Sequence, residues 1–128
     1  MRVLVTGALG MLGHKVVAEA QRRGHEAVAA DIDEFDLTDA AATRAFVGDA
    51  RPDAVVNCAA YTNVDGAEEH EDVALAVNGD GAGNVAAAAA LPVASIALIF
   101  VSGGNVDIKT GARAHAVVAT ETFVPSNP

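Results

Sequence analysis

The sequence predicts an α/β fold in which a doubly wound parallel sheet of four or five strands lies between two layers of helices. Strand-like and helix-like segments alternate along the 128 residues, an order typical of parallel sheets with crossover helices. The strand-like segments are apolar runs, as expected when helices cover both faces of a sheet. Hydrophobic residues make up 52% of the chain and aromatic residues 4%, so we expect a core rich in Ala and Val.

The expected elements follow in chain order. We predict strands at 2–6, 25–31, 54–58 and 95–101, arranged 3-2-1-4 across the sheet, with a further short strand at 114–119. We predict helices at 11–23, at 39–47 after an N-cap at Thr38, and at 66–90, where Gly79, Gly81 and Gly83 weaken or divide the run. We expect residues 1–128 to form a single domain with a divergent tail at 103–128 that frays at its end.

Residues 3–13 carry the most informative pattern, an apolar strand-like run followed by Gly7, Gly10 and Gly13. Gly7 can adopt the backbone angles of a tight turn, Gly10 lets a phosphate approach the chain, and Gly13 lets a helix lie close to the strand. A strand, a glycine turn and a helix N-terminus in this order indicate a Rossmann-like site for the pyrophosphate of a dinucleotide. The alternative is a purely structural turn with chance glycines.

Asp31 supports the dinucleotide interpretation. It ends the second predicted strand, close to the roughly 20 residues expected between the glycine turn and a carboxylate that accepts hydrogen bonds from the adenosine ribose. Asp33 and Glu34 follow it, and no Arg or Lys is near. A 2′-phosphate about 4 Å from a carboxylate would be repelled by roughly 4 kcal/mol, so we expect NAD(H) to be preferred over NADP(H).

Charge and cysteine content limit the partners and the compartment. Seventeen acidic and eight basic residues give a net charge of −9, and the absence of a basic cluster argues against nucleic acid and anionic membranes. Cys58 is the only cysteine, and the sequence shows neither a leader nor an apolar run long enough for a membrane span, so we expect a cytoplasmic protein. The four histidines lack ligand-like spacing, and we expect no metal site.

The motifs together indicate a family. The chain resembles the extended short-chain dehydrogenase/reductases, most closely the dTDP-4-dehydrorhamnose reductases, over residues 1–102. The segments that carry this resemblance are 6–13, 36–39, 52–62, 64–65 with 67–68, and 77–78. The resemblance implies NAD(P)H-dependent reduction of a nucleotide-sugar ketone in dTDP-rhamnose biosynthesis.

The resemblance also implies roles for individual residues. Gly10, Met11 and Leu12 would lie against the pyrophosphate, and Asp36 and Leu37 would border the adenine. The remaining implied positions are Ala59, Ala60 and Tyr61, beside the ribose and nicotinamide, and Asn78, a structural or proton-relay asparagine. Simpler alternatives are that Asp36 and Asp39 cap the following helix, that Cys58 is a small buried hydrophobe, and that Tyr61 only covers the rim.

The catalytic residues of the family are the weak part of the match. Such reductases use a Tyr-x-x-x-Lys pair, but Tyr61 is the only tyrosine and neither lysine follows a tyrosine at that spacing. Ser102 is a weak catalytic candidate at the end of the fourth strand. Loss of a general acid costs about 10²–10⁴ in rate, so we expect either a poor reductase, a noncatalytic NAD-binding module or partner subunit, or a remnant without a ligand. An exposed sheet edge would also favour self-association.

Overall fold

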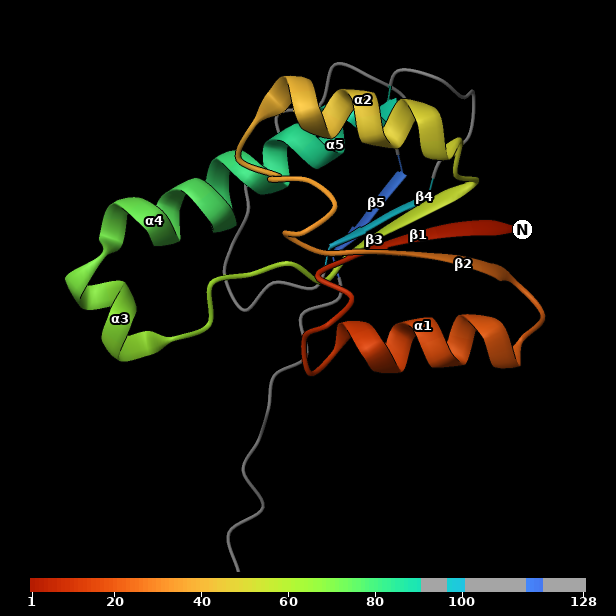
Figure 1. Ribbon diagram of the computed structural model, residues 1–128, viewed down its shortest axis with the longest axis horizontal. Helices are drawn as coiled ribbons and strands as arrows, with labels where there is room; N and C mark the ends of the chain where they lie inside the picture. The colour runs from red at the N-terminus through yellow and green to blue at the C-terminus, as the bar shows by residue number, and fades with distance from the viewer. Residues whose placement is uncertain (91–96, 101–114, 119–128) are drawn as a thin grey trace, which may run out of the picture.

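The computed structural model describes residues 1–90, 97–100 and 115–118, which include a five-stranded parallel sheet (Figure 1). The strands are β1 (Arg2–Thr6), β2 (Glu26–Ala30), β3 (Ala54–Asn57), β4 (Ala97–Phe100) and β5 (His115–Val118). Every neighbouring pair is parallel. The predicted doubly wound α/β fold is therefore confirmed; the first strand has the predicted bounds, and the other four are slightly shorter than predicted.

The predicted strand order was wrong. The observed order is β2-β1-β3-β4-β5, so β3 pairs with β1 and not with the outer edge of β2. Val5 has Ala29 as its neighbour on one side and Val56 on the other. The physical reason is burial: all four residues of β3 are buried, whereas most of β2 is partly or fully exposed. The fully buried strand lies inside the sheet, and the more exposed strand lies at its edge.

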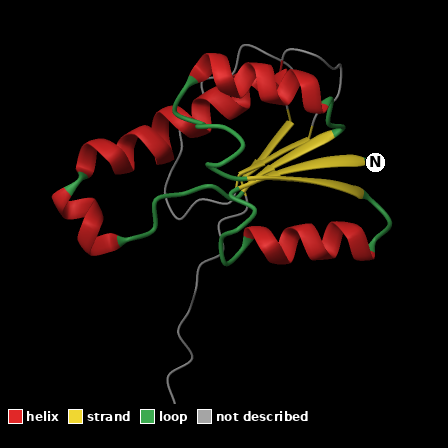
Figure 2. Cartoon of the chain, viewed as in Figure 1, coloured by secondary structure: helices red, strands yellow, loops and turns green. Residues whose placement is uncertain are grey.

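Helices cover both faces of the sheet (Figures 1 and 2). One face is covered by α1 (Gly13–Arg22). The other face is covered by α2 (Ala40–Ala50) and α5 (Ala82–Ala90), which pack against each other. This arrangement confirms the predicted three layers. No helix in the described part of the chain is long and apolar enough to cross a membrane.

The predicted helix at 66–90 is divided into several pieces. They are α3 (Val64–Glu69), α4 (Glu71–Leu75), a π-helical turn η1 (Ala76–Gly81) and α5. The first break is at His70, whose backbone leaves helical geometry at φ −131° and ψ 56°, and the glycines at 79 and 81 lie in the π-helical turn. A second correction concerns the start of α2. Asp39, not Thr38, is the N-cap, because its carboxylate accepts hydrogen bonds from the N–H groups of residues 41 and 42.

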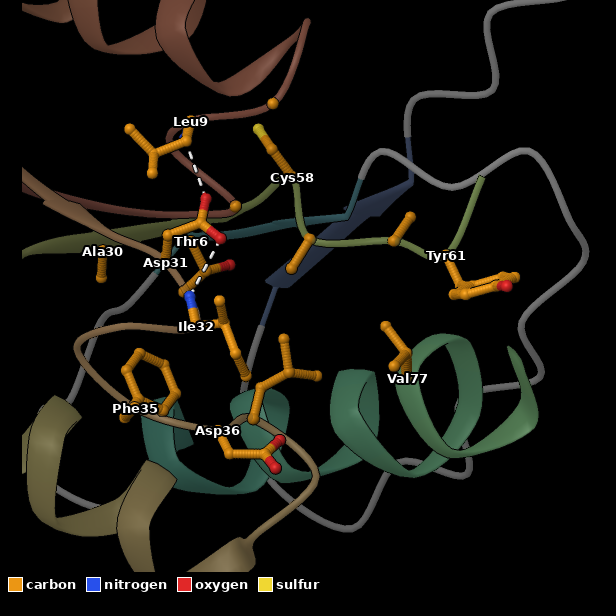
Figure 3. A pocket seen from close by; sticks show the side chains of 15 residues that line it. Thr6, Leu9, Ala30, Asp31, Ile32, Phe35, Asp36, Cys58, Tyr61 and Val77 are labelled. Carbon is orange, nitrogen blue, oxygen red and sulfur yellow. Dashed lines mark hydrogen bonds between the residues drawn. The ribbon is translucent and has the colours of Figure 1, made fainter. Parts of the chain in front are cut away.

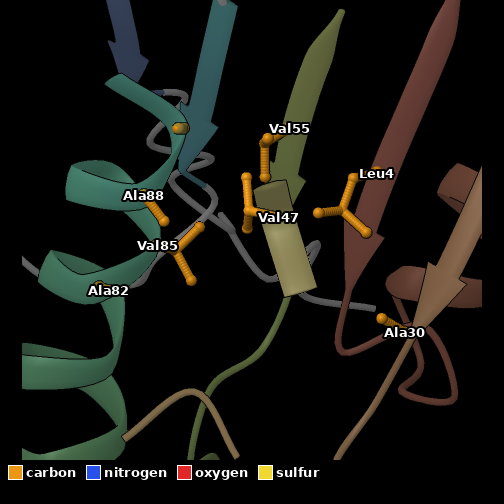
Figure 4. Packing of buried hydrophobic residues seen from close by; sticks show 8 residues of the cluster. Leu4, Ala30, Val47, Val55, Ala82, Val85 and Ala88 are labelled. Carbon is orange, nitrogen blue, oxygen red and sulfur yellow. The ribbon is translucent and has the colours of Figure 1, made fainter. Parts of the chain in front are cut away.

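Small aliphatic side chains fill the core, as the composition predicted. Between the sheet and the α2–α5 layer, Val47 and Val85 pack with Leu4, Val55 and several alanines (Figure 4). A smaller cluster under α1 joins residues 3, 5 and 56 to valines 16 and 17. The core thus lies along β1 and β3, and it fixes the carboxyl ends of these two strands side by side. Residues 91–96, 101–114 and 119–128, which include Ser102 and the predicted frayed end, lie outside the described residues.

Candidate functional site

A cavity of about 310 Å³ opens at the carboxyl ends of β1, β2 and β3 (Figure 3). Its position follows from the strand order. The chain leaves β1 toward β2 on one side and enters β3 on the other, so the loops after β1 and β3 diverge and leave a crevice. The lining residues come from four segments: Thr6, Gly7, Leu9 and Gly10; Ala30, Asp31, Ile32, Phe35, Asp36 and Leu37; Cys58, Ala59, Ala60 and Tyr61; and Val77.

The glycine turn between β1 and α1 forms one end of the cavity. Gly7 has a positive φ of 65°, and a Cβ there would lie 2.5 Å from the backbone nitrogen of Ala59. A Cβ on Gly13 would lie 2.0 Å from the carbonyl oxygen of Gly7. The turn is closed by a 3.1 Å hydrogen bond from the N–H of Gly10 to the Gly7 carbonyl. Glycine is therefore required at 7 and 13 for close approach between backbones.

The start of α1 leaves backbone donors free. Within the described residues, the N–H groups of Met11, Leu12 and Gly13 have no protein acceptor. Leu12, the N-cap, provides no side-chain cap, and the first turn holds no acidic residue. Free N–H groups and the positive end of the helix dipole favour an anion at such a terminus. The ten-residue helix therefore presents an anion-binding end beside the cavity.

Asp31 is held in place by the backbone around it (Figure 3). One carboxylate oxygen accepts the N–H of Leu9 at 2.8 Å, and the other accepts the N–H of Ile32 at 2.9 Å. A carboxylate oxygen has a second acceptor position, so both oxygens can still accept from a ligand. The carboxylate of Glu34 accepts the N–H of Asp31 at 2.7 Å. The carboxylate of Asp31, which lines the cavity, therefore has that of Glu34, which does not, as a neighbour.

Asp36 and Leu37 form the adjoining wall. One carboxylate oxygen of Asp36 accepts both the hydroxyl of Thr38, at 2.7 Å, and its N–H, at 2.9 Å. These two hydrogen bonds, the hydroxyl first, hold the pKa of Asp36 below its ordinary value of 3.8. Asp36 and Asp39 were both candidates for the cap of the following helix, and only Asp39 caps α2. Asp36 orders its own loop and leaves its second oxygen without a partner among the described residues.

A buried hydrogen bond joins the two strands at the base of the cavity. The Thr6 hydroxyl donates to the side-chain oxygen of Asn57 at 2.5 Å, and the N–H of Ala59 donates to the same oxygen at 3.2 Å. Thr6 is 1% and Asn57 4% exposed. Cys58 is only half-buried and lines the cavity, and this burial raises the pKa of its thiol.

Tyr61 is fixed through its backbone. Its N–H donates to the side-chain oxygen of Asn78 at 2.8 Å, and the Asn78 amide donates back to the Tyr61 carbonyl at 3.2 Å. Asn78 does not line the cavity, whereas its neighbour Val77 does. The π-helical turn thus fixes one wall with an asparagine and lines the cavity with a valine.

The structure brings most of the predicted site residues together. Those that line the cavity are Gly7, Gly10, Asp31, Asp36, Leu37, Ala59, Ala60 and Tyr61, and those that do not are Met11, Leu12, Gly13 and Asn78. Sequence reasoning missed the lining residues Thr6, Leu9, Ala30, Ile32, Phe35, Cys58 and Val77. All seven are immediate neighbours of predicted positions, which is the signal that could have identified them. Among the described residues no group of three or more His, Cys, Asp or Glu side chains could hold a metal.

Comparison with known proteins identifies the family. A family model described as RmlD substrate binding domain matches residues 1–125. A dTDP-4-dehydrorhamnose reductase of Streptomyces griseus is 48% identical over 87 residues, which are 68% of this chain and 29% of the relative. A second one, from Burkholderia thailandensis, is 35% identical over 127 residues, 99% of this chain and 41% of the relative. The chain therefore spans less than half the length of these relatives.

Solved structures agree with this assignment. A dTDP-4-dehydrorhamnose reductase from Clostridium acetobutylicum has a TM-score of 0.71 and 37% identity, covering 77% of this chain and 35% of that one. The enzyme from Bacillus anthracis, solved with NADP, has a TM-score of 0.69 at the same identity and coverage. A Thermus thermophilus UDP-glucose 4-epimerase solved with NAD has a TM-score of 0.70 and 26% identity, over 89% of this chain and 42% of that one. The resemblance stated from the motifs is confirmed, and the chain belongs to the RmlD substrate binding domain family.

Proposed function

We propose that this chain binds a nicotinamide dinucleotide in the cavity at the strand ends. One observation carries the proposal: the N–H groups at the start of α1, which have no acceptor among the described residues, stand beside a cavity lined by the carboxylate of Asp31, which the N–H of Leu9 in the glycine turn holds in place. A pyrophosphate needs the donors, and a ribose diol needs the acceptor. The NAD and NADP complexes of related structures support the same conclusion.

The residues present fit such a cofactor. The backbone N–H groups of Met11 and Leu12 would hold the pyrophosphate, and Gly10 would let it lie against the chain because no side chain stands in the way. Asp31 would hold the adenosine ribose. The second oxygen of Asp36 would accept from the exocyclic amine of the adenine, while Tyr61, with the alanines at 59 and 60, would line the ribose and nicotinamide side. When bound, the nicotinamide supplies a hydride, and the protein's part is to bind and orient it.

The preference for NAD(H) over NADP(H) belongs to the same proposal. Glu34 lies against the backbone of Asp31, so two carboxylates would meet a 2′-phosphate. Arg22 and Arg23, the nearest cations in sequence, are both bonded to Glu19 on α1. The related Bacillus anthracis enzyme was solved with NADP, so the affinities of this chain for NADH and NADPH can be compared with the cofactor found in that relative.

We further propose that the bound cofactor serves the reduction of a nucleotide-sugar ketone, as the names of the relatives indicate. A second candidate is a noncatalytic NAD-binding module or partner subunit. Within these 128 residues, Tyr61 is the only tyrosine and no Lys follows it at the spacing of the family's pair, so these residues alone supply no such pair. A cytoplasmic location and self-association through a sheet edge stay predictions.

Titration with NADH and NADPH, followed by calorimetry, tests the cofactor proposal. We expect NADH to bind more tightly, and Asp31→Asn to weaken NADH binding about tenfold or more, since a hydrogen bond to a charged group contributes about 1.5–3 kcal/mol. Asp49→Asn, on the exposed side of α2, is the matched control and should leave the affinity unchanged. Tighter binding of NADPH would refute the preference. Absence of binding by either cofactor would refute the proposal as a whole.

Turnover separates the two functional candidates. Oxidation of NADH in the presence of a dTDP-4-keto-6-deoxy sugar, measured with this chain alone, supports the reductase. Binding of NADH without turnover supports the noncatalytic module.

A further inference from the structure

Residues 31–39 form one wall of the cavity as a loop without helix or strand. Side chains on neighbouring helices contact the carbonyl groups of this loop. The Asn84 side-chain amide, on α5, donates to the Leu37 carbonyl at 3.0 Å and to the Thr38 carbonyl at 3.3 Å. The fully buried Thr43, on α2, donates its hydroxyl to the Asp39 carbonyl at 2.8 Å and lies 3.3 Å from the Leu37 carbonyl. Side chains of two helices therefore contact the carbonyl groups of a loop that lines the cavity.

The geometry favours a side chain with two donors at position 84. Two carbonyl oxygens face the side chain, and the NH₂ group of the asparagine amide can donate to both. Asparagine is a poor helix former, and yet it stands inside α5, where it is half-buried. One turn earlier, a Cβ on Gly81 would lie 1.8 Å from the Leu37 side chain, so the absence of a side chain there lets the loop lie against the helix.

We propose that Asn84 is a positioning residue that sets the adenine side of the cavity, acting through the carbonyls of Leu37 and Thr38. It lines no part of the cavity itself. The loop that it holds carries Asp36 and Leu37, the residues proposed to border the adenine. This inference rests on the proposed function, because it assigns the adenine half of the proposed cofactor to this wall. The restraint that Asn84 places on the loop can be measured without any ligand.

The test uses Asn84→Leu, which keeps the size and removes the donor, and Asn84→Asp, which replaces the donor with an acceptor. Gln21→Glu, on the exposed end of α1, makes the same amide-to-carboxylate change away from the cavity and is the control. Amide hydrogen exchange at residues 32–38 should become faster in both Asn84 variants and stay unchanged in the control. The affinity for ADP should fall about fivefold to tenfold, as expected for one or two lost hydrogen bonds, and the affinity for NADH should fall by the same factor.

Faster exchange confined to residues 32–38 is the readout that a general loss of stability would not give, because unfolding of the whole chain would speed exchange everywhere and weaken both ligands alike. Equal losses for ADP and NADH place the effect in the adenosine diphosphate half that both ligands share. Unchanged exchange in this loop, or a loss confined to NADH, would overturn the inference. If the wild-type chain binds no adenine nucleotide, the proposed function fails, and exchange alone then decides whether Asn84 holds the wall. If Asn84→Leu does not fold, Asn84→Asp gives the same two readouts.

Discussion

The contact between Gly13 and the turn before it allows a quantitative prediction for Gly13→Ala. A Cβ at this position would lie 2.0 Å from the Gly7 carbonyl oxygen and 2.8 Å from the Cα of Ala8. Both are backbone atoms and cannot rotate away. An unstrained contact of this kind is about 3.3 Å, so the start of α1 would have to move by roughly 1.3 Å.

Such a movement would weaken the packing of α1 on the sheet. Val16 and Val17, on this helix, pack against the valines of β1 and β3. Forcing an extra carbon into a packed interface costs typically about 1–3 kcal/mol, and we expect a loss of about that size in the free energy of unfolding. Because the same movement displaces the N–H groups at the start of α1, we also expect the affinity for NADH to fall at least tenfold.

Urea unfolding and NADH titration measure the two effects. The matched control is Gly48→Ala in α2, where a Cβ would meet nothing within 4 Å and where replacing glycine in a helix should stabilise by roughly 0.5–1 kcal/mol. The two identical substitutions should therefore have opposite signs. If Gly13→Ala were as stable as the wild type, close packing of α1 on the turn could not be the reason for glycine at this position.

Three further predictions concern stability. Thr6→Val removes the hydroxyl that donates to Asn57 and should lower the free energy of unfolding by about 1–2 kcal/mol. Thr6→Ser keeps a hydroxyl and should retain most of the wild-type stability. Equal stability of the two variants would contradict this prediction. Arg51 ends α2 with a left-handed backbone at φ 47°, a conformation that glycine adopts without strain. Arg51→Gly should therefore raise the melting temperature by about 2–4 °C. A lower melting temperature would count against strain at this residue. Hydrogen bonds from Arg22 and Arg23 lower the pKa of Glu19 from 4.5 to about 2. The stabilisation that Glu19→Gln removes should therefore be present above pH 4.5 and disappear as the pH falls toward 2. Melting temperatures of wild type and variant that differ equally at all pH values would contradict this.

The sequence predicted the features that are encoded locally. The strand at residues 2–6, the glycine turn and Asp31 lie within one short stretch of chain, where periodicity and turn chemistry decide the structure. The order of the strands was not predictable in this way. Each crossover can pass to either side of β1, and the choice depends on which strand is best buried, a property of the whole sheet.

The same distinction applies to the site. The residues missed by sequence reasoning include Thr6, whose partner Asn57 is 51 residues away. The bonds from Asn78 to Tyr61 and from Asn84 to Leu37 span 17 and 47 residues. No periodic pattern reports such pairs. An asparagine inside a helical run is the one local sign, because it is unfavourable there unless its amide has a partner elsewhere.

Asn78 and Asn84 stand on one continuous helical run, but they hold different walls of the cavity and share no partner. Substitutions at independent sites add within about 0.5 kcal/mol, so the loss of stability in the double variant Asn78→Ala/Asn84→Ala should equal the sum of the single losses within that margin. Urea unfolding of the three variants provides the measurement. A larger coupling would show that the helical run that carries the two residues makes the walls move as one unit, and the walls proposed for the adenine and the nicotinamide could then not be altered separately.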